Sequence, residues 1–216
     1  MIGVFGGTFD PVHFGHLRTA LDVMQGVGLE EVRFTPLHGA VHRDQPQAPA
    51  ELRLEMVRLA VRPQAGFVVD DREIRRAGDS YTVDTLASLR RELPQRRLCL
   101  LLGMDAFSGF ADWHRPDEIL KLAHLIVMHR PGEAGPGDPR MKLLIDGSLV
   151  SSADQLMAKD HGSILLHPVT QLDISASQIR KLLAKGRTAR FLLPEAVLQL
   201  IEKNGLYSAY HTKEPQ

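Results

Sequence analysis

The chain has 216 residues, 44% of them apolar, which fits one large folded α/β domain or two small ones. Lysine plus arginine and aspartate plus glutamate number 26 each, so no global positive field is available for binding along a nucleic-acid backbone. Any anion site must therefore be local.

The cysteine content and the apolar runs indicate the compartment. The single cysteine, Cys99, lies in the apolar run LCLLLG and is expected to be buried, which fits a reducing, cytoplasmic setting. The N-terminal MIGVFGG has no basic lead, and no apolar run approaches the roughly 20 residues of a membrane helix. We expect no export, no membrane span and no nucleic-acid partner. Nothing here indicates whether the chain is a monomer or a dimer.

Short apolar runs alternate with segments of helical periodicity along most of the chain. Four strand-like runs each precede a predicted helix: IGVF before residues 14–26, VRFTP before 50–62, FVVD before 81–93, and LCLLLG before 115–123. HLIVMH and SILLHPV predict a fifth and a sixth strand. This alternation predicts an α/β, Rossmann-like fold: a mostly parallel sheet with helices on both faces, whose ligands bind beyond the carboxyl ends of the strands.

The remaining segments differ in character. RPGEAGPGDPR (130–140) holds three glycines and three prolines and predicts a loop, and the polar stretch 38–50 predicts a second one of the length that often serves function. SASQIRKLLAKG and PEAVLQLIEKNG predict two helices that end at glycines. We expect a single domain, 1–216, with a small C-terminal helical part at about 175–207.

The stretch FGGTFDPVHFGH (5–16), directly after the first strand, carries the strongest chemical signal. Gly6 and Gly7 let the backbone approach a phosphate oxygen, and the next helix points its N-terminal N–H groups at the same place. The pattern is neither GxGxxG nor GxxxxGK[ST], so it supports neither a nicotinamide-binding Rossmann site nor a Walker-type phosphate loop. Anion binding is the prediction.

His13 and His16 lie three residues apart across the start of that helix, so both imidazoles can face one ligand above it. The residues alone leave three readings: ligation of zinc, a structural role in the turn and cap, or donation to phosphate. A zinc site would need a third protein ligand, and neither HExxH nor a cysteine cluster is present. The neighbouring glycines favour phosphate.

A second anion-facing helix start is predicted at ISASQIR (174–180). Ser175 and Gln178 have the spacing of a capping box, so a helix should begin at Ser175. Arg180, in its second turn, could add a bidentate cation to an anion held there. A capped surface helix with a solvated Arg180 is the alternative.

These motifs resemble those of a known family. GGTFDPVHFGHL resembles the GxFDPxHxGH signature of the nucleotidyltransferase superfamily, and ISASQIR is similar to its ISxxxxR element. SYTVDTL (80–86), GMD (103–105) and ADWHRPDEIL (111–120) resemble segments of the nicotinate mononucleotide adenylyltransferases in particular. The resemblance covers nearly the whole chain. It implies an enzyme of NAD biosynthesis that joins AMP from ATP to nicotinate mononucleotide, giving nicotinate adenine dinucleotide and pyrophosphate, with Mg²⁺ on the ATP.

The resemblance also implies which residues form the site. His13, His16 and Arg180 would donate to the phosphates as the catalytic residues, and no side chain is expected to bind a metal. The ATP-binding set would be Gly6, Gly7, Thr8, Phe9, Gly103, Asp105, Ile174 and Ser175. The acceptor-binding set would be His42, Arg43, Tyr81, Thr82, Trp113, His114 and Arg130. Within it, Trp113 would stack on the pyridine ring, and Tyr81, Thr82 and the backbone at His114 would hold the carboxylate.

Two of these residues also have plainer readings. Trp113, the only tryptophan, stands in a polar loop, where it could be a stacking platform or a rim residue packed on the next helix. Asp105 could cap a helix after Gly103, lie near the nucleotide, or do both.

The chain departs from the family's pattern in two places. In PLHGAVHR (36–43), Leu37 stands where an asparagine is common, and two prolines that usually precede His42 are missing. His114 stands where a tyrosine is frequent. These changes concern the stiffness of the loop and the rim of the base pocket.

Other functions remain open. The acceptor could be nicotinamide mononucleotide or phosphopantetheine, or the chain could be a non-catalytic nucleotide sensor. Phosphopantetheine adenylyltransferases are shorter and are not expected to carry SYTVDTL or the tryptophan loop. Intact His13, His16 and Arg180 argue against a sensor.

Overall fold

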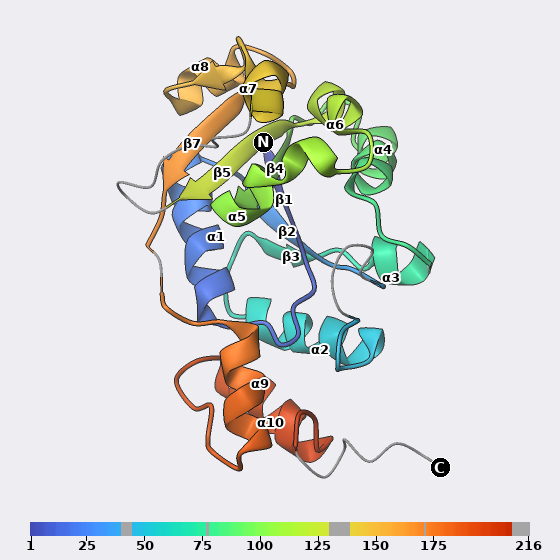
Figure 1. The fold of residues 1–216 in the computed structure, drawn as a ribbon, viewed down its shortest axis with the longest axis vertical. Coiled ribbons are helices and arrows are strands. Elements are labelled where there is room, and N and C mark those ends of the chain that lie inside the picture. The colour runs from blue at the N-terminus through green and yellow to red at the C-terminus, as the bar shows by residue number, and fades with distance from the viewer. Residues whose placement is uncertain (40–44, 77, 130–138, 171, 209–216) are drawn as a thin grey trace.

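The computed structural model describes residues 1–39, 45–76, 78–129, 139–170 and 172–208. Their strands form a seven-stranded sheet in the order β3-β2-β1-β4-β5-β7-β6, and every pairing in it is parallel (Figure 1). The strands are β1 Ile2–Gly7, β2 Glu31–Pro36, β3 Phe67–Val69, β4 Leu98–Gly103, β5 His124–His129, β6 Leu149–Val150 and β7 Ile164–Pro168. The Rossmann-like α/β prediction is confirmed.

Helices connect these parallel strands, as expected of βα units. They are α1 Phe14–Val27, α2 Ala50–Val61, α3 Arg72–Arg76, α4 Thr82–Glu92, α5 Met104–Ser108, α6 Pro116–Leu122, α7 Pro139–Ile145, α8 Ala153–Met157, α9 Ala176–Ala184 and α10 Glu195–Lys203, with a 3-10 turn at Phe110–Asp112. All six predicted strands and the predicted long helices are present within a residue or two at each end.

Two predictions of the connections were incomplete or wrong. Strand β6 has only two residues, too few for a period of two to show in the sequence. The loop predicted for 130–140 ends earlier than expected, because α7 begins at Pro139, and proline is tolerated in a first helical turn. Residues 130–138 lie outside the described residues.

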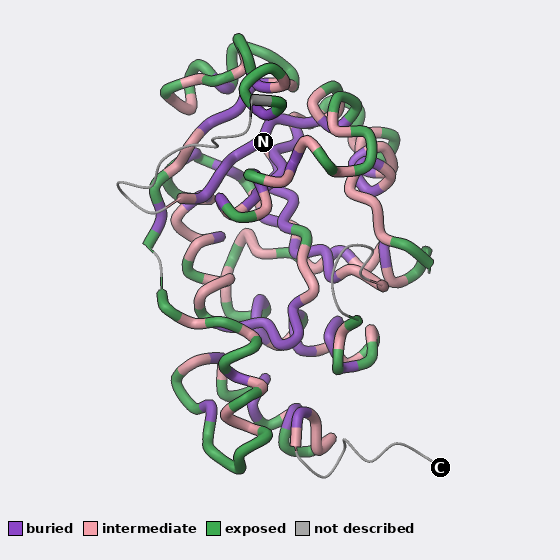
Figure 2. Tube along the Cα trace, in the orientation of Figure 1, coloured by how far each residue is buried: buried purple, intermediate pink, exposed green. Residues whose placement is uncertain are grey.

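The strands alternate their side chains between two apolar cores. On β4, Cys99 and Leu101 join the core beneath α1 and α2, while Leu98, Leu100 and Leu102 join the core beneath α4 and α6. Figure 2 shows the strands as the most continuously buried part of the trace. Cys99 is fully buried, as predicted, and burial raises the pKa of its thiol to about 12.

The two C-terminal helices extend the first of these cores. They lie at one end of the molecule, below α2 in Figure 1, and α10 packs on α2. Ile179 of α9 and Val197 and Ile201 of α10 are buried in the same cluster as the core residues of α1. Within the described residues, no helix is both long and apolar enough to cross a bilayer. This packing brings the start of α9 to the carboxyl end of β1.

Candidate active site

The site lies where the strand order changes direction. β1 has β2 on one side and β4 on the other, so the chain leaves β1 and β4 at the switch point where ligands of such sheets bind. Gly6 of β1 and Gly103 at the end of β4 both border open space, because a Cβ built on either would meet no atom within 4 Å. A ligand can therefore approach the backbone of both strands.

The turn after β1 has its backbone near this open space, but the side chain of Phe9 in this turn points into the core. Phe9 has φ 48° and packs its ring against Phe5, Phe34 and His16, with 2% of its surface exposed. A Cβ on Gly7 would lie 3.0 Å from that ring. The side chain of Phe9 is part of the core, so the predicted contact with ATP would have to be made by its backbone.

His13 and His16 meet at the start of α1. His13 is the N-cap residue, and its backbone N–H donates to Nδ1 of His16 at 3.3 Å. The two rings stack with centroids 3.7 Å apart and an interplanar angle of 30°. Because Nδ1 of His16 accepts, its neutral ring carries the proton on Nε2, which is left to donate to a ligand. The zinc hypothesis receives no support from the described residues, which contain no group of three or more potential metal ligands.

Burial keeps both imidazoles neutral. It lowers the pKa of His13 to about 4, and it lowers the pKa of His16 well below its usual value, with a smaller contribution from the charge of His13. Nδ1 of His13 is buried and has no hydrogen-bond partner among the described residues. A buried polar atom without a partner is costly in a folded protein, and it marks a place where a ligand would complete the bonding.

Gly15 allows the histidine pair to lie close to the segment that precedes α9. A Cβ on this residue would lie 2.9 Å from the ring of His13 and 3.3 Å from the carbonyl oxygen of Ile174. The segment before α9 therefore crosses directly over the first turn of α1. The N-termini of the two helices meet at the same place, and both direct N–H groups and positive dipole ends there.

The structure confirms that a helix starts after Ser175, whose Oγ accepts from the backbone N–H of Gln178 at 3.2 Å. The Arg180 side chain is 24% exposed, and it is held by hydrogen bonds instead of extending freely into solvent. Its Nη1 donates to the carbonyl oxygen of Asp10 at 2.7 Å, and its Nη2 donates to Ser177 at 3.3 Å. Its buried Nε has no partner among the described residues. Of the five N–H donors of the guanidinium, the Nε–H is thus among those left for a ligand.

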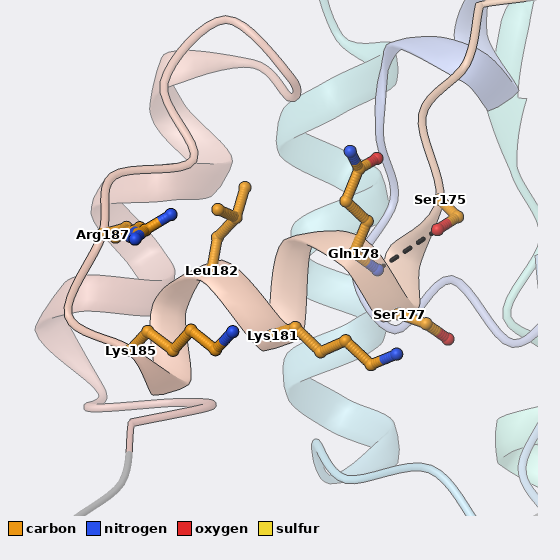
Figure 3. Close-up of a pocket in the computed structure, with 7 residues that line it drawn as sticks. All are labelled: Ser175, Ser177, Gln178, Lys181, Leu182, Lys185 and Arg187. Atoms are coloured by element: carbon orange, nitrogen blue, oxygen red, sulfur yellow. Dashed lines mark hydrogen bonds between the residues drawn. The ribbon is translucent and has the colours of Figure 1, made fainter.

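A cationic groove continues from this helix start along the outside of α9 (Figure 3). It has a volume of about 280 Å³ and is lined by Ser175, Ser177, Gln178, Lys181, Leu182, Lys185 and Arg187. The ammonium ends of Lys185 and Lys181 point along the helix toward Ser177. No acidic residue lines the groove, so its positive potential adds to that of the helix N-terminus.

A second cluster forms between α4 and the tryptophan loop. The rings of Tyr81 and His114 lie 4.5 Å apart, and Thr82 begins α4 directly after Tyr81. Trp113 is half-buried and packs at 5.5 Å on Phe110. This leaves part of the indole ring exposed beside His114.

An ion pair fixes the loop that carries this cluster. Arg115 has left-handed backbone angles at the start of α6 and donates to Asp84 of α4 at 2.9 Å. Asp84 is therefore bound on the outer surface of α4, and the tryptophan loop is held beside the helix that presents Tyr81 and Thr82. The predicted acceptor residues Tyr81, Thr82, Trp113 and His114 lie together.

The remaining predicted residues are placed differently or not at all. Gly103, not Asp105, is the N-cap of α5, and Asp105 is exposed in its first turn, so the capping role is wrong. His42, Arg43 and Arg130 lie outside the described residues.

The sequence analysis missed a buried network that holds the loops around the site. Arg53, 1% exposed, donates to the carbonyl oxygens of Ala48, Thr8 and His38 at 3.1, 2.8 and 2.9 Å. The sequence does carry a signal for this network: Arg53 lies on the buried face of α2, which continues with Met56, Val57, Ala60 and Val61. A lone arginine on an apolar helix face indicates buried carbonyl acceptors.

The comparisons with known proteins agree with this geometry. A family model described as "Cytidylyltransferase-like" matches residues 4–182. A relative from Methylococcus capsulatus named "Probable nicotinate-nucleotide adenylyltransferase" is 44% identical over 209 residues, covering 96% of this chain and all of the relative. One of the same name from Pseudomonas putida is 49% identical over 210 residues, covering 96% of this chain and 95% of the relative.

Solved structures show the same fold at low sequence identity. The nicotinic acid mononucleotide adenylyltransferase of Plasmodium falciparum in complex with NaAD is 17% identical, with a TM-score of 0.70 over 95% of this chain and 96% of that one. The same enzyme in complex with APC gives a TM-score of 0.67 with the same coverage of both chains. Because relatives at 44–49% identity match over nearly their full length, the chain belongs to the nicotinate-nucleotide adenylyltransferase family within the cytidylyltransferase-like proteins.

Proposed function

We propose that this chain transfers AMP from ATP to nicotinate mononucleotide and releases pyrophosphate, using His13, His16 and Arg180 as the donors to the phosphates. The observation that carries the proposal is the convergence of these three side chains, two of them with buried and unpartnered nitrogen atoms, at the meeting point of two helix N-termini. Helix N-termini with neighbouring cations favour phosphate groups.

The reaction balances without a covalent enzyme intermediate. An oxygen of the mononucleotide's 5′-phosphate attacks the α-phosphorus of ATP, the bond from that phosphorus to the α,β-bridging oxygen breaks, and the bond's electrons leave with pyrophosphate. The nucleophile is already an anion, so no general base is needed. The chain's part is to hold two anions in line and to stabilise the charge that develops on the leaving phosphates.

Neutral imidazoles suit this task at the α-phosphate. Nε2 of His16 and Nδ1 of His13 can each offer one N–H, and a dry, fixed donor is worth more than one in water. The formal positive charge comes from Arg180, held in place by Asp10 and Ser177. The cationic groove along α9 begins at Ser175 and Ser177 of this helix start, and its positive potential would favour the β- and γ-phosphates.

ATP enters as its Mg²⁺ complex in this proposal. The metal ion would be held by oxygen atoms of the triphosphate and by water, while exposed Asp105, two residues after Gly103, would lie near the nucleotide. Bound on the phosphates, Mg²⁺ supplies charge neutralisation. The buried free thiol of Cys99 supports the cytoplasm as the compartment.

The second cluster suits the pyridine end of the acceptor. The first turn of α4 offers its backbone N–H groups and the Thr82 hydroxyl to a carboxylate, and the partly exposed ring of Trp113 offers a stacking surface. Tyr81 and His114 close the same corner with their paired rings. Neutral donors at a helix N-terminus favour the acid over the amide.

The direct test is product identification. The purified chain is incubated with ATP, MgCl₂ and one acceptor at a time: nicotinate mononucleotide, nicotinamide mononucleotide or 4′-phosphopantetheine. Products are identified by mass, and pyrophosphate is measured in parallel. Nicotinate adenine dinucleotide and pyrophosphate in equal amounts are expected with the first acceptor. Nucleotide binding without product with any acceptor would favour a sensor, and faster turnover of another acceptor would change the substrate.

A further inference from the structure

Tyr207 joins the far end of the described chain to the turn after β1. It follows α10 with a left-handed φ of 60°, and its side chain is turned inward, with the residue 8% exposed. Its hydroxyl donates to Oδ1 of Asp10 at 2.6 Å. Burial, and then the charge of Asp10, raise the pKa of Tyr207, so the hydroxyl keeps its proton and remains a donor. An aromatic residue in a strained backbone conformation is thus held by one polar bond.

Asp10 is held on several sides by other segments. Its carboxylate accepts from the backbone N–H groups of Gln47 and Ala48 at 2.8 and 3.1 Å, besides the bond from Tyr207. Its own carbonyl oxygen accepts from Nη1 of Arg180 at 2.7 Å, while its Oδ2 stays 3.8 Å from the same nitrogen. The carboxylate is therefore near Arg180 without a close hydrogen bond to it.

This arrangement has a consequence for Arg180. A buried carboxylate that loses one donor has a strong drive to replace it, and the nearest unsatisfied cation is Arg180, only 3.8 Å away. A turn of the carboxylate toward the guanidinium would tighten that ion pair and draw the cation toward Asp10. The phosphates would then have to compete with a carboxylate for the same charge.

We propose that Tyr207 is a positioning residue for catalysis: its hydroxyl holds the Asp10 carboxylate in place, and this keeps the Arg180 guanidinium available to the triphosphate. The inference rests on the proposed role of Arg180 toward ATP. It assigns a function to a residue that lies beyond the part of the chain matched by the family model. Tyr207 touches no reacting atom in this scheme and acts only through Asp10 and Arg180.

A double-mutant cycle on ATP binding tests it. Tyr207→Phe removes one hydroxyl and keeps the ring, and it is made in the wild-type chain and in Arg180→Ala. In the wild-type background, the KM for ATP is expected to rise about tenfold, the loss typical of a hydrogen bond to a charged group, while the KM for the mononucleotide stays within twofold. In the Arg180→Ala background, the same change should alter the KM for ATP by less than about twofold.

Controls separate positioning from general stability and from failure of the proposed function. Ser208→Ala removes a neighbouring hydroxyl that donates to Gly205 at 2.9 Å, and it should leave all constants unchanged. Titration calorimetry with ATP in the absence of acceptor repeats the cycle without turnover, and the fitted number of sites reports the folded fraction of each variant. This arm holds even if nicotinate mononucleotide is not the acceptor.

The outcomes are distinct. Equal losses of ATP affinity in both backgrounds would mean that Tyr207 does not act through Arg180, and would overturn the proposal. Unchanged ATP affinity in Tyr207→Phe, with full site occupancy, would overturn it as well. A loss in the wild-type background that disappears in Arg180→Ala supports it, whichever acceptor the enzyme uses.

Discussion

The imidazole rings of His13 and His16 stack 3.7 Å apart, and this contact is compatible with two neutral rings but not with two charged ones. Two imidazolium ions at this separation would repel strongly in a buried site. In the proposed reaction, the histidine pair of the opening motif would therefore act as two neutral N–H donors, and Arg180 on another helix would supply the formal charge.

Because the buried histidines are neutral in the folded state, the free energy of unfolding should fall in acid. Burial lowers the folded-state pKa of His13 to about 4, whereas an unfolded histidine titrates near 6.5. As the pH falls, the histidine of the unfolded state therefore takes up a proton before that of the folded state. The contribution of His13 to the free energy of unfolding is fully present above pH ~6.5 and is lost as the pH falls toward the folded-state pKa. Between pH 7 and 5 the free energy of unfolding should drop by about 2 kcal/mol from His13 alone.

Urea denaturation at the two pH values measures this drop. His13→Asn should show a smaller drop than the wild type, and a variant of the exposed His161, His161→Asn, should match the wild type. Identical drops in all three proteins would mean that His13 titrates normally in the folded state.

Removing the imidazole of His16 should lower the rate of the reaction more than it lowers the stability of the fold. In His16→Ala, the kcat for product formation is expected to fall about 10²–10³-fold, because one fixed donor to the developing phosphate charge is lost. The melting temperature should fall by only a few degrees, since the main bond lost is the one from the His13 backbone N–H at 3.3 Å. Steady-state kinetics with His161→Ala as the control checks it. A folded His16→Ala enzyme with the wild-type kcat would remove this residue from the site.

The guanidinium of Arg180 should matter for ATP in particular. Arg180→Ala is expected to raise the KM for ATP and lower kcat, because a charge-assisted contact to the triphosphate is lost. Arg180→Lys should recover part of the loss, as lysine keeps the charge but lacks the planar fork that reaches Asp10 and Ser177 together. Arg190→Ala, on an exposed arginine paired with Glu195, is the matched control. Unchanged ATP kinetics in Arg180→Ala would make α9 a structural helix.

The buried Arg53 predicts a large loss of stability from a single change. Arg53→Met keeps the apolar stem but leaves the carbonyls of Ala48, Thr8 and His38 without their donor, at a cost of about 3–5 kcal/mol. Arg58→Met lies on the same helix with a half-exposed side chain and ion pairs of 3.6 and 3.7 Å, so its cost should be below about 1 kcal/mol. Chemical denaturation compares the two. Equal costs would show that the buried contacts contribute no more than a surface pair.

The sequence predicted the sheet and the two anion-facing helix starts because local rules determine them. Alternating βα periodicity, the glycines at the end of β1 and a serine cap at α9 each act within a few residues. The network of Asp10, Arg53 and Tyr207 could not be predicted in the same way, since its bonds join residues up to 197 positions apart. Only the folded packing of α9 and α10 against the start of α1 brings those groups together.

The enzyme is expected to prefer nicotinate mononucleotide over nicotinamide mononucleotide. The corner formed by Tyr81, Thr82 and the tryptophan loop presents neutral donors at the first turn of α4, which suit a carboxylate and would be left partly unpaired by an amide. The kcat/KM for nicotinate mononucleotide should therefore exceed that for nicotinamide mononucleotide, by a factor that reaches on the order of 10⁴ in favourable cases. Trp113→Ala should weaken both substrates alike, because ring stacking does not depend on the substituent.

Thr82→Val separates the polar from the apolar part of this corner. The change keeps the branched shape and removes the hydroxyl, so it should narrow the gap between the two mononucleotides mainly by slowing the acid form. The measurement is kcat/KM for both substrates at saturating ATP in the wild type, Thr82→Val and Trp113→Ala. If the wild type used both mononucleotides equally well, the donors of α4 would not read the carboxylate, and the chain would be a broader pyridine-nucleotide adenylyltransferase whose selectivity is set by ring stacking alone.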